Sequence, residues 1–485
     1  MIRNIRTLFV ATLSLAMMYG TILPAVASNK INVLVIDSGT DFTHKLLKPK
    51  ARPNLPELNG KKGVDDDKNG YIDDIYGWNF VENNNILVNL YDTPPQYDKL
   101  LKIMEYLGRL QAYGKEDFTK DEWNWLATNY NDPAIQPWIG FIGGWAHGTH
   151  CAGIIADKNN AVSLNAIRHI ATGAAPKFIQ ANLDLVNLHF ADKRQKEGRS
   201  LEDSANEQRV SMADLEAYFK QLGAKNAKDI QKKAAYIASM KPRLINCSFG
   251  SENSTLVAMM KKNMTQWGFL NPTDKEVQQV VNLFVKHAFL PRDVALFSGC
   301  KDALVFIAAG NSSENLDPFI TSPNNVPIEN KIVIGATDMD RRLAAFSCYG
   351  AKTVDVAVPG VNIYATYPNN KMGYMSGTSM ACPMALRYAS MVLNENPNLT
   401  PVQLKKILMG TVDKKDWLKG KVRTSGVIND VRAIYAAKQV KQGRSIDEAI
   451  QIANKKVKDK AVRTFRTTSP DLSDPEVRAM YMTVF

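Results

Sequence analysis

The chain is poor in cysteine and in long apolar runs, and each lack excludes a class of protein. Five cysteines in 485 residues are too few for a disulfide-stapled scaffold, and an odd count leaves at least one thiol unpaired within the chain. Beyond the first 27 residues, no apolar run approaches the roughly 20 residues that a membrane helix needs. The HExxH pattern of helical zinc sites is absent, and so are internal repeats.

Three of the cysteines, Cys151, Cys247 and Cys382, lie beside motifs described below, where small buried side chains are needed. They are expected to be buried free thiols. Cys300 and Cys348 remain as a possible pair.

The charge is basic but not concentrated. Lysine and arginine number 60 against 48 acidic residues, for a formal net charge of +12. Such a balance can indicate nucleic-acid or membrane-surface binding, but here acids are interspersed along the chain. The densest basic stretch, residues 455–460, is explained equally well as a solvated helix face. No nucleic-acid partner is therefore predicted.

The N-terminus has the order of a secretory signal peptide. Arg3 and Arg6 precede an apolar run from Leu8 to Met18, and Ala25-Val26-Ala27 supplies a small-residue cleavage pattern. A buried helix or an uncleaved anchor is the alternative, but the run is short for a membrane span. Residues 1–27 are predicted to be cleaved, which leaves a mature chain without membrane contact in a secreted or periplasmic location.

Short apolar runs alternate with helical patterns along the rest of the chain. Runs of about five residues without polar alternation are typical of parallel strands that are covered on both faces. The fold class predicted is α/β, with a mostly parallel central sheet and helices on both faces. The strands are expected at 31–36, 177–181, 244–248, 304–308, 331–336 and 354–358, and the helices at 214–221, 229–240, 275–287 and 379–393.

Three segments depart from this alternation of strands and helices. Residues 84–140 hold three tryptophans with little periodicity, and residues 187–228 are charged. Both are interpreted as surface insertions. Residues 439–485 are interpreted as a basic C-terminal extension with one amphipathic helix near 446–457.

Four polar residues follow or head apolar elements in a way that points to a shared site. Asp37 ends the apolar run 31–36, and Asn311 follows the run 304–308. The carboxyl ends of parallel strands are where sites form in α/β sheets. His147 heads a segment rich in small residues that would pack closely as a helix. Ser379 follows Gly377 and would lie at a helix N-terminus, where free N–H groups favour a developing negative charge.

Taken singly, each residue has an ordinary interpretation as a turn residue, a structural histidine or a helix cap. Taken in the order Asp, His, Ser, they match one arrangement of the catalytic triad. The sequence resembles the subtilase family over roughly residues 30–438, and residues 28–438 are expected to form the subtilase-like catalytic domain. The segments that carry the resemblance are Asp37-Ser38-Gly39, His147-Gly148-Thr149-His150, Gly377-Thr378-Ser379-Met380-Ala381, Ile245-Asn246-Cys247-Ser248-Phe249-Gly250 and Val358-Pro359-Gly360.

The resemblance implies a subtilisin-like serine endopeptidase with polypeptide substrates. Ser379 would be the nucleophile, His147 its general base, and Asp37 the carboxylate that orients the imidazole. Asn311 would supply an oxyanion donor. Ser248, Phe249, Gly250 and Gly310 would bind the substrate backbone. The alternative is a catalytically inactive subtilase fold that serves as a binding module.

Three departures from the family pattern bear on folding and access. Met384-Ala385-Leu386-Arg387 replaces the usual His-Val-Ala-Gly, which affects helix packing more than chemistry. The interval from Asp37 to His147 is wide, so the insertion is expected to overhang the site. Only residues 28–36 separate the expected cleavage point from Asp37, so the mature chain either folds without an N-terminal pro-domain or uses another segment, such as the C-terminal extension.

An acidic loop predicts a calcium site. Residues 65–74 read Asp-Asp-Asp-Lys-Asn-Gly-Tyr-Ile-Asp-Asp. Asp65, Asp67, Asn69 and Asp73 fall at positions 1, 3, 5 and 9 of an EF-hand-like loop, with the Tyr71 carbonyl at position 7. The usual Glu at position 12 is missing, since Tyr76 stands there. The alternative is an acidic turn without an ion.

Overall fold

A computed structural model of the chain describes residues 30–172, 177–196, 209–461 and 472–484. The predicted signal peptide, residues 1–27, lies outside these ranges. No helix of the described residues is both long and apolar enough to cross a bilayer.

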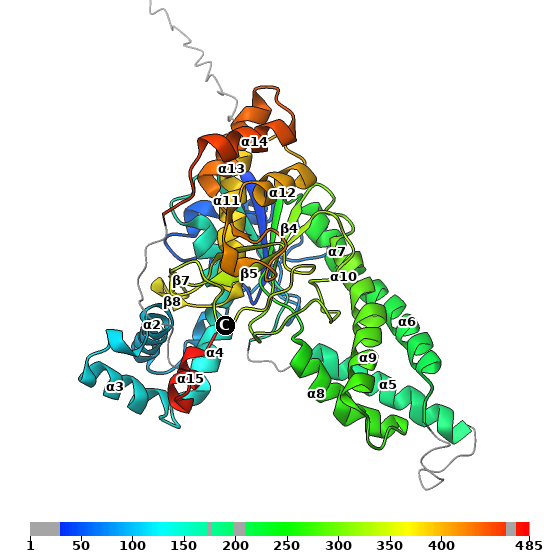
Figure 1. The fold of residues 1–485 in the computed structure, drawn as a ribbon. Helices are drawn as coiled ribbons and strands as arrows, with labels where there is room; N and C mark the ends of the chain where they lie inside the picture. The colour runs from blue at the N-terminus through cyan, green and yellow to red at the C-terminus, as the bar shows by residue number, and fades with distance from the viewer. Residues whose placement is uncertain (1–29, 173–176, 197–208, 462–471, 485) are drawn as a thin grey trace, which may run out of the picture.

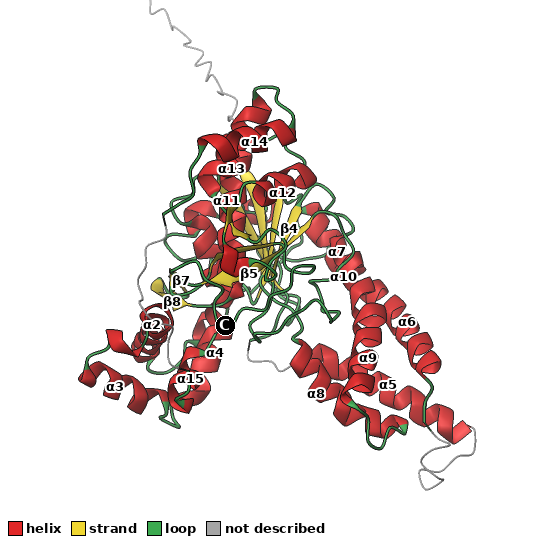
Figure 2. Ribbon diagram, in the orientation of Figure 1, coloured by secondary structure: helices red, strands yellow, loops and turns green. Residues whose placement is uncertain are grey.

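An eight-stranded sheet occupies the centre of the molecule (Figure 2). Its strands lie in the order β2-β1-β3-β4-β5-β6-β10-β9, and every pairing is parallel except β10 with β9. A separate antiparallel hairpin is formed by β7 and β8. The strands are β1 Ile31–Asp37, β2 Val162–Arg168, β3 Leu244–Cys247, β4 Leu304–Ala308, β5 Lys331–Thr337, β6 Val356–Pro359, β7 Ile363–Tyr367, β8 Lys371–Met375, β9 Asp413–Lys414 and β10 Gly426–Val427.

Both faces of the sheet are buried, as the unbroken apolar runs require. Successive side chains of a strand point to opposite faces, so Val33 and Val35 of β1 enter one core while Leu34 and Ile36 enter another. Helices α4 (Gln136–Ala156) and α11 (Thr378–Glu395) cover the first face. Helices α7 (Gln231–Ser239) and α10 (Leu290–Phe297) cover the second. The predicted fold class is thereby confirmed.

Two strand assignments from the sequence need correction. Lys177–Ala181 is not a strand but the start of helix α5 (Lys177–Lys196). Its buried residues Ile179, Leu183, Val186 and Phe190 recur at helical spacing, which a five-residue window does not reveal. Conversely, β2 was missed because it is an edge strand with polar residues, such as Asn165, whose side chain donates to the Arg52 carbonyl oxygen at 2.7 Å.

The segment 84–140 is helical, contrary to its apparent lack of periodicity. It forms α2 (Tyr97–Tyr113), α3 (Lys120–Tyr130) and the beginning of α4. The C-terminal helix α15 (Pro475–Tyr481) packs against α2, and the Gln111 side chain donates to the carbonyl oxygens of Tyr481 and Thr483 at 2.8 and 2.7 Å. The C-terminal end of the chain therefore returns to the first insertion.

A second helical unit projects from the sheet on the other side (Figure 1). It contains α5, α6 (Met212–Asp229), α8 (Asn253–Met264) and α9 (Asp274–Phe284), which α10 connects to the sheet. Its own core is built around the fully buried Phe219, Trp267 and Phe284. Of the segment 187–228, predicted as an insertion, residues 187–196 and 209–228 are described and supply part of this unit, which extends well beyond them.

The remaining helices lie at the opposite end of the molecule from the two projections (Figure 1). The amphipathic helix expected near 446–457 is α14. The helices at that end are α12 Pro401–Gly410, α13 Asp430–Lys441 and α14 Ile446–Lys456. The short helix α1, Leu55–Asn59, lies elsewhere in the chain and precedes the acidic loop.

Helix α4 touches the carboxyl end of β1 through a glycine. A Cβ atom on Gly148 would lie 2.2 Å from the Gly39 carbonyl oxygen and 3.0 Å from the Asp37 Cβ. Both distances are shorter than van der Waals contact. The helix and the turn after β1 therefore approach each other as closely as their backbones allow.

We expect Gly148→Ala to force these two elements apart and to lower the free energy of unfolding by about 1–3 kcal/mol, the usual cost of overpacking. Gly140→Ala, in the same helix, is the matched control, because no atom lies within 4 Å of its added Cβ. There the better helix propensity of alanine should stabilise the protein by up to about 1 kcal/mol. Denaturant melts of both variants measure the difference, and equal stabilities would contradict the close contact.

Candidate active site

The topology of the sheet opens a crevice beside β1. The chain runs from β1 to β2 on one side and then crosses to β3 on the other, so the loops that leave β1 and β3 diverge. Ligand sites in α/β sheets form at such switch points, outside the carboxyl ends of the strands. Asp37 is the last residue of β1, Ser248 follows β3, and Asn311 lies three residues past β4.

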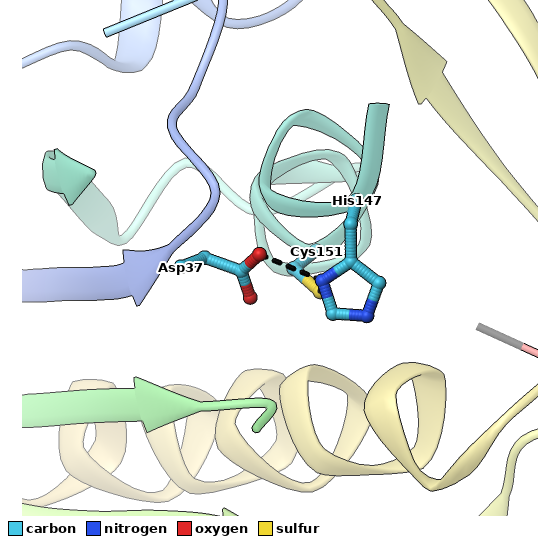
Figure 3. Close-up of side chains that lie close together, drawn as sticks. All are labelled: Asp37, His147 and Cys151. Atoms are coloured by element: carbon cyan, nitrogen blue, oxygen red, sulfur yellow. Dashed lines mark hydrogen bonds and ion pairs between the residues drawn. The ribbon is translucent and has the colours of Figure 1, made fainter. Parts of the chain in front are cut away.

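Asp37 and His147 form a short hydrogen bond at this crevice (Figure 3). The His147 Nδ1 atom lies 2.6 Å from Asp37 Oδ1, which also accepts the Ser38 N–H at 2.7 Å. Both residues are almost fully buried. His147 lies in the middle of α4 and not at a helix start as predicted, because residues 136–146 extend the helix in the N-terminal direction.

The environment of His147 favours the protonated imidazole. Desolvation by burial lowers its pKa, but the charge and hydrogen bond of Asp37, with a contribution from Cys151, raise the pKa above the ordinary value for histidine. With Nδ1 held by the carboxylate, Nε2 is the nitrogen left to exchange a proton with another group.

Cys151 lies one helical turn after His147, and its sulfur lies beside the Nδ1 edge of the imidazole (Figure 3). Its Sγ is 4.0 Å from His147 Nδ1 and donates to the Ser379 carbonyl oxygen at 3.4 Å. Burial raises the pKa of this thiol to about 11. Since only a thiolate acts as a nucleophile or metal ligand, Cys151 serves here as a small packing residue that links α4 to α11.

Ser379 lies in the first turn of α11 and faces the same crevice. Its Oγ donates to the Ser248 carbonyl oxygen at 3.2 Å, and the Ser248 hydroxyl donates to the Ser379 carbonyl oxygen at 3.0 Å. These reciprocal bonds fix α11 against the end of β3. Pro383 lies inside the helix, beyond its first turn.

Asn311 is held by the residue that precedes the serine. The Thr378 backbone N–H and hydroxyl both donate to Asn311 Oδ1 at 2.9 Å, and the Gly310 N–H donates to the Thr378 hydroxyl at 3.1 Å. The amide plane of Asn311 is therefore fixed beside the N-terminus of α11.

A cavity of about 250 Å³ joins these residues. It is lined by His147, Ser379 and Asn311, and by all four residues predicted to bind substrate, which are Ser248, Phe249, Gly250 and Gly310. Asp37 lies behind His147, away from the cavity. The structure thus gathers in one place the residues that the sequence analysis derived from four separate motifs.

The acidic loop is only partly arranged as predicted. Carboxylate oxygens of Asp65 and Asp67 lie within 4.8 Å of each other and of Glu57, which the sequence analysis missed. Asp73 turns its Oδ2 to the Gly63 N–H at 2.8 Å. The Asn69 Oδ1 accepts the Tyr71 N–H at 2.8 Å. The Tyr71 ring itself packs on aromatic neighbours, among them Tyr236 at 4.5 Å between ring centroids.

Glu57 organises this loop from outside it. Its Oε1 accepts the N–H groups of Asp66 and Asp67 at 2.8 and 3.0 Å, and its Oε2 accepts the Asp73 N–H at 2.9 Å. The residue is buried and lies in α1. An acidic residue in a short helix just upstream of the loop was the only sequence signal for it.

All five cysteines are free and buried. The interpretation of Cys151, Cys247 and Cys382 as buried thiols is confirmed, and Cys300 and Cys348 do not pair.

Comparisons with known proteins identify the family of this chain. A family model described as "Subtilase family" matches residues 28–428. The chain belongs to the subtilase family, which confirms the family predicted from the motifs.

The relatives are distant. Subtilisin-like protease 1 of Plasmodium vivax is 27% identical over 416 residues, which cover 84% of this chain and 48% of that protein. Subtilisin BL of Lederbergia lenta is 37% identical over 111 residues, 23% of this chain and 39% of that protein. The chain spans about half the length of the first of these relatives. Among solved structures, a cold adapted subtilisin-like serine proteinase matches at a TM-score of 0.40 and 16% identity, over 83% of this chain and 88% of its own.

We expect Asp37→Asn to lower the pKa of His147. The wild-type value should lie above the ordinary 6.5, and without the carboxylate charge desolvation is the largest remaining influence on the pKa, which favours the neutral ring. Titration of labelled histidines by NMR measures both proteins. His150, in the same helix, is the internal control, because burial lowers its pKa to about 3 and it should stay neutral in both proteins. An unchanged His147 pKa would contradict the coupling.

Proposed function

We propose that this protein is a serine endopeptidase that hydrolyses peptide bonds through Asp37, His147 and Ser379. The observation that carries the proposal is the 2.6 Å contact between Asp37 and the His147 imidazole, beside a cavity that also exposes Ser379 and Asn311. Membership of the subtilase family supports the assignment.

In the first step, the Ser379 hydroxyl exchanges its hydrogen bond with the Ser248 carbonyl for one with His147 Nε2. The serine oxygen attacks the carbonyl carbon of the scissile bond while its proton passes to Nε2. The neutral form of His147 is the base in this transfer; the raised pKa makes that form a stronger base, and Asp37 stabilises the resulting imidazolium.

The negative charge that develops on the carbonyl oxygen needs donors nearby. The Asn311 amide and the Ser379 N–H at the start of α11 are the proposed pair, and loss of one such donor typically lowers kcat by about a hundred- to a thousandfold. His147 then returns the proton to the departing amine, and an acyl-enzyme forms on Ser379. Water, activated by the same imidazole, hydrolyses this ester and regenerates the serine hydroxyl.

The substrate would bind as an additional strand. Residues Ser248, Phe249 and Gly250 continue from the end of β3 along the cavity. An extended peptide that pairs with this backbone would pass its carbonyl carbon in front of Ser379. Backbone pairing is largely independent of sequence, which suits an endopeptidase.

We expect a fluorophosphonate probe to label the wild-type protein and to leave Ser379→Ala unlabelled, because the probe reacts only with an activated serine. Ser254→Ala removes an exposed serine of α8 and should be labelled like the wild type. Labelling is read by mass spectrometry of the intact protein and of its peptides.

Absence of labelling in the folded wild type would favour the alternative, an inactive subtilase fold that binds polypeptides. Equal labelling of Ser379→Ala would instead place the reactive serine elsewhere.

We also propose that the protein acts outside the cytoplasm. The support is the order of residues 1–27, with two arginines, an apolar run and a small-residue cleavage pattern. N-terminal sequencing of the exported protein tests this, and a mature chain that still begins at Met1 would contradict cleavage.

Calcium binding at the acidic loop is proposed on the fit of its side chains. Three carboxylates, from Glu57, Asp65 and Asp67, converge within 4.8 Å, and no lysine or arginine of the described residues pairs with them at salt-bridge distance. Calcium takes six to eight oxygen ligands of this kind, in part from backbone carbonyls and water. The ion would neutralise the cluster and brace the segment between β1 and α2.

We expect calcium to raise the melting temperature of the wild type, and Asp65→Asn combined with Asp67→Asn to abolish most of that increase. A ligand at a hundredfold excess over its Kd stabilises the folded state by about 2.7 kcal/mol. Asp302→Asn, at an exposed turn outside the loop, is the control. Glu57 is unsuited to the test, since its carboxylate accepts three backbone N–H groups in any case. A full calcium response in the double variant would place the ion elsewhere.

A further inference from the structure

The cavity beside Ser379 carries two carboxylates that the proposed mechanism does not use. Glu252 and Glu314 both line it, and its lining residues include no lysine or arginine. Neither glutamate forms a salt bridge with a described residue. The cavity is therefore negatively charged in the absence of substrate.

Glu314 is held in place by a neighbour in the cavity wall. The Ser312 hydroxyl donates to Glu314 Oε2 at 2.6 Å. The Ser312 hydroxyl has only one proton, and this bond uses it. The Cys348 thiol, whose Sγ lies 3.1 Å from the Ser312 Oγ, is therefore the donor to that oxygen. The carboxylate of Glu314 is thus oriented before any substrate arrives.

Glu252 faces the proposed oxyanion residue. It precedes helix α8 at the N-cap position, but its side chain does not cap that helix. Instead its carboxylate accepts the backbone N–H of Asn311. This bond holds the carboxylate beside Asn311, the residue whose side-chain amide would bind the substrate carbonyl oxygen.

The two carboxylates disfavour each other's charge. Desolvation raises the pKa of Glu252, the Asn311 N–H opposes the rise, and the negative charge of Glu314 adds to it. Two like charges in one cavity are unfavourable until a cation lies between them. A positively charged ligand group would relieve the repulsion between the two carboxylates.

The rest of the wall suits the stem of a long side chain. Ala308, Ala309 and Leu316 line the same cavity and are buried. The methylene groups of a lysine or arginine pack on such a surface while the charged head reaches polar partners. A volume of about 250 Å³ lies near the lower end for small-molecule pockets and fits one side chain.

We propose that this cavity is a pocket for a basic side chain, that of the substrate residue whose carbonyl carbon Ser379 attacks, with Glu252 and Glu314 as the specificity-determining residues. The inference rests on the function proposed above and names its substrate class, polypeptides cleaved after arginine or lysine.

The test compares peptides that differ only at that residue, with arginine, its neutral isostere citrulline, leucine or glutamate. Wild-type kcat/KM should be highest for arginine, about ten- to a hundredfold above citrulline, the range for a hydrogen bond to a charged group. Glu314→Gln keeps the bond from Ser312 but removes the charge, and together with Glu252→Gln it should bring the ratio close to one.

Two further variants sharpen the comparison. Glu314→Lys should transfer the preference to the glutamate peptide, which a merely structural role would not do. Glu329→Gln removes an exposed carboxylate outside the cavity and should leave the arginine-to-citrulline ratio unchanged. All rates are normalised to the fraction of protein that a fluorophosphonate labels.

The outcomes separate the two proposals. A labelled protein that prefers leucine, or a double variant that keeps the wild-type ratio, would overturn the basic pocket and leave the peptidase assignment intact. A folded protein that neither labels nor cleaves any peptide would overturn both.

Discussion

The contact between helix α4 and the end of β1 determines the geometry of the site. The helix delivers the His147 imidazole to Asp37 only because Gly148 lets its backbone meet the Gly39 carbonyl. At that separation the carboxylate and the ring nitrogen are 2.6 Å apart, in a region from which solvent is excluded. In such surroundings a charge interaction is much stronger than in water, so the carboxylate charge and hydrogen bond, together with Cys151, outweigh the effect of burial on the pKa of the imidazole.

Ser379, the proposed nucleophile, is placed by strands far from it in sequence. Ser379 exchanges hydrogen bonds with Ser248 at the end of β3, and Thr378 is bonded to Asn311 beyond β4. Two chain segments therefore fix the first turn of α11, and Asn311, the proposed oxyanion residue, is bonded directly to the residue before Ser379. In the proposed mechanism, such preorganisation would spare the reaction the cost of ordering its groups at the transition state.

The sequence predicted those features of the site that depend on a local pattern of residues. Asp37, Ser379 and Asn311 could be placed because each directly follows or heads a buried element whose apolar run is visible in a few residues. The length of α4 was missed because its N-terminal half belongs to an insertion rich in aromatic residues. The helix α2 was also missed, although Leu100, Ile103, Met104 and Leu107 recur at helical spacing.

Other errors arose where tertiary contacts decide the outcome. Glu57 joins Asp65 and Asp67 only because α1 folds back onto the loop, and no spacing rule reports that approach. The edge strand β2 carries polar residues whose partners lie on other segments, so its sequence lacks the unbroken apolar run of a central strand. Short windows also failed at Lys177–Ala181, because five residues span little more than one helical turn and cannot show a helical repeat.

The path from α9 to α10 joins two separate cores. Leu290, at the start of α10, packs in the core of the projecting helical unit, while Leu296 and Phe297 at its other end pack against the sheet. Between α9 and α10 the chain makes one wider turn, Val285–Phe289, without leaving the helical path. The projecting unit buries its own apolar residues, so it can open as a cooperative unit of its own. The continuous helical path through α9, Val285–Phe289 and α10 then determines how strongly such an opening disturbs the strands that end at the site.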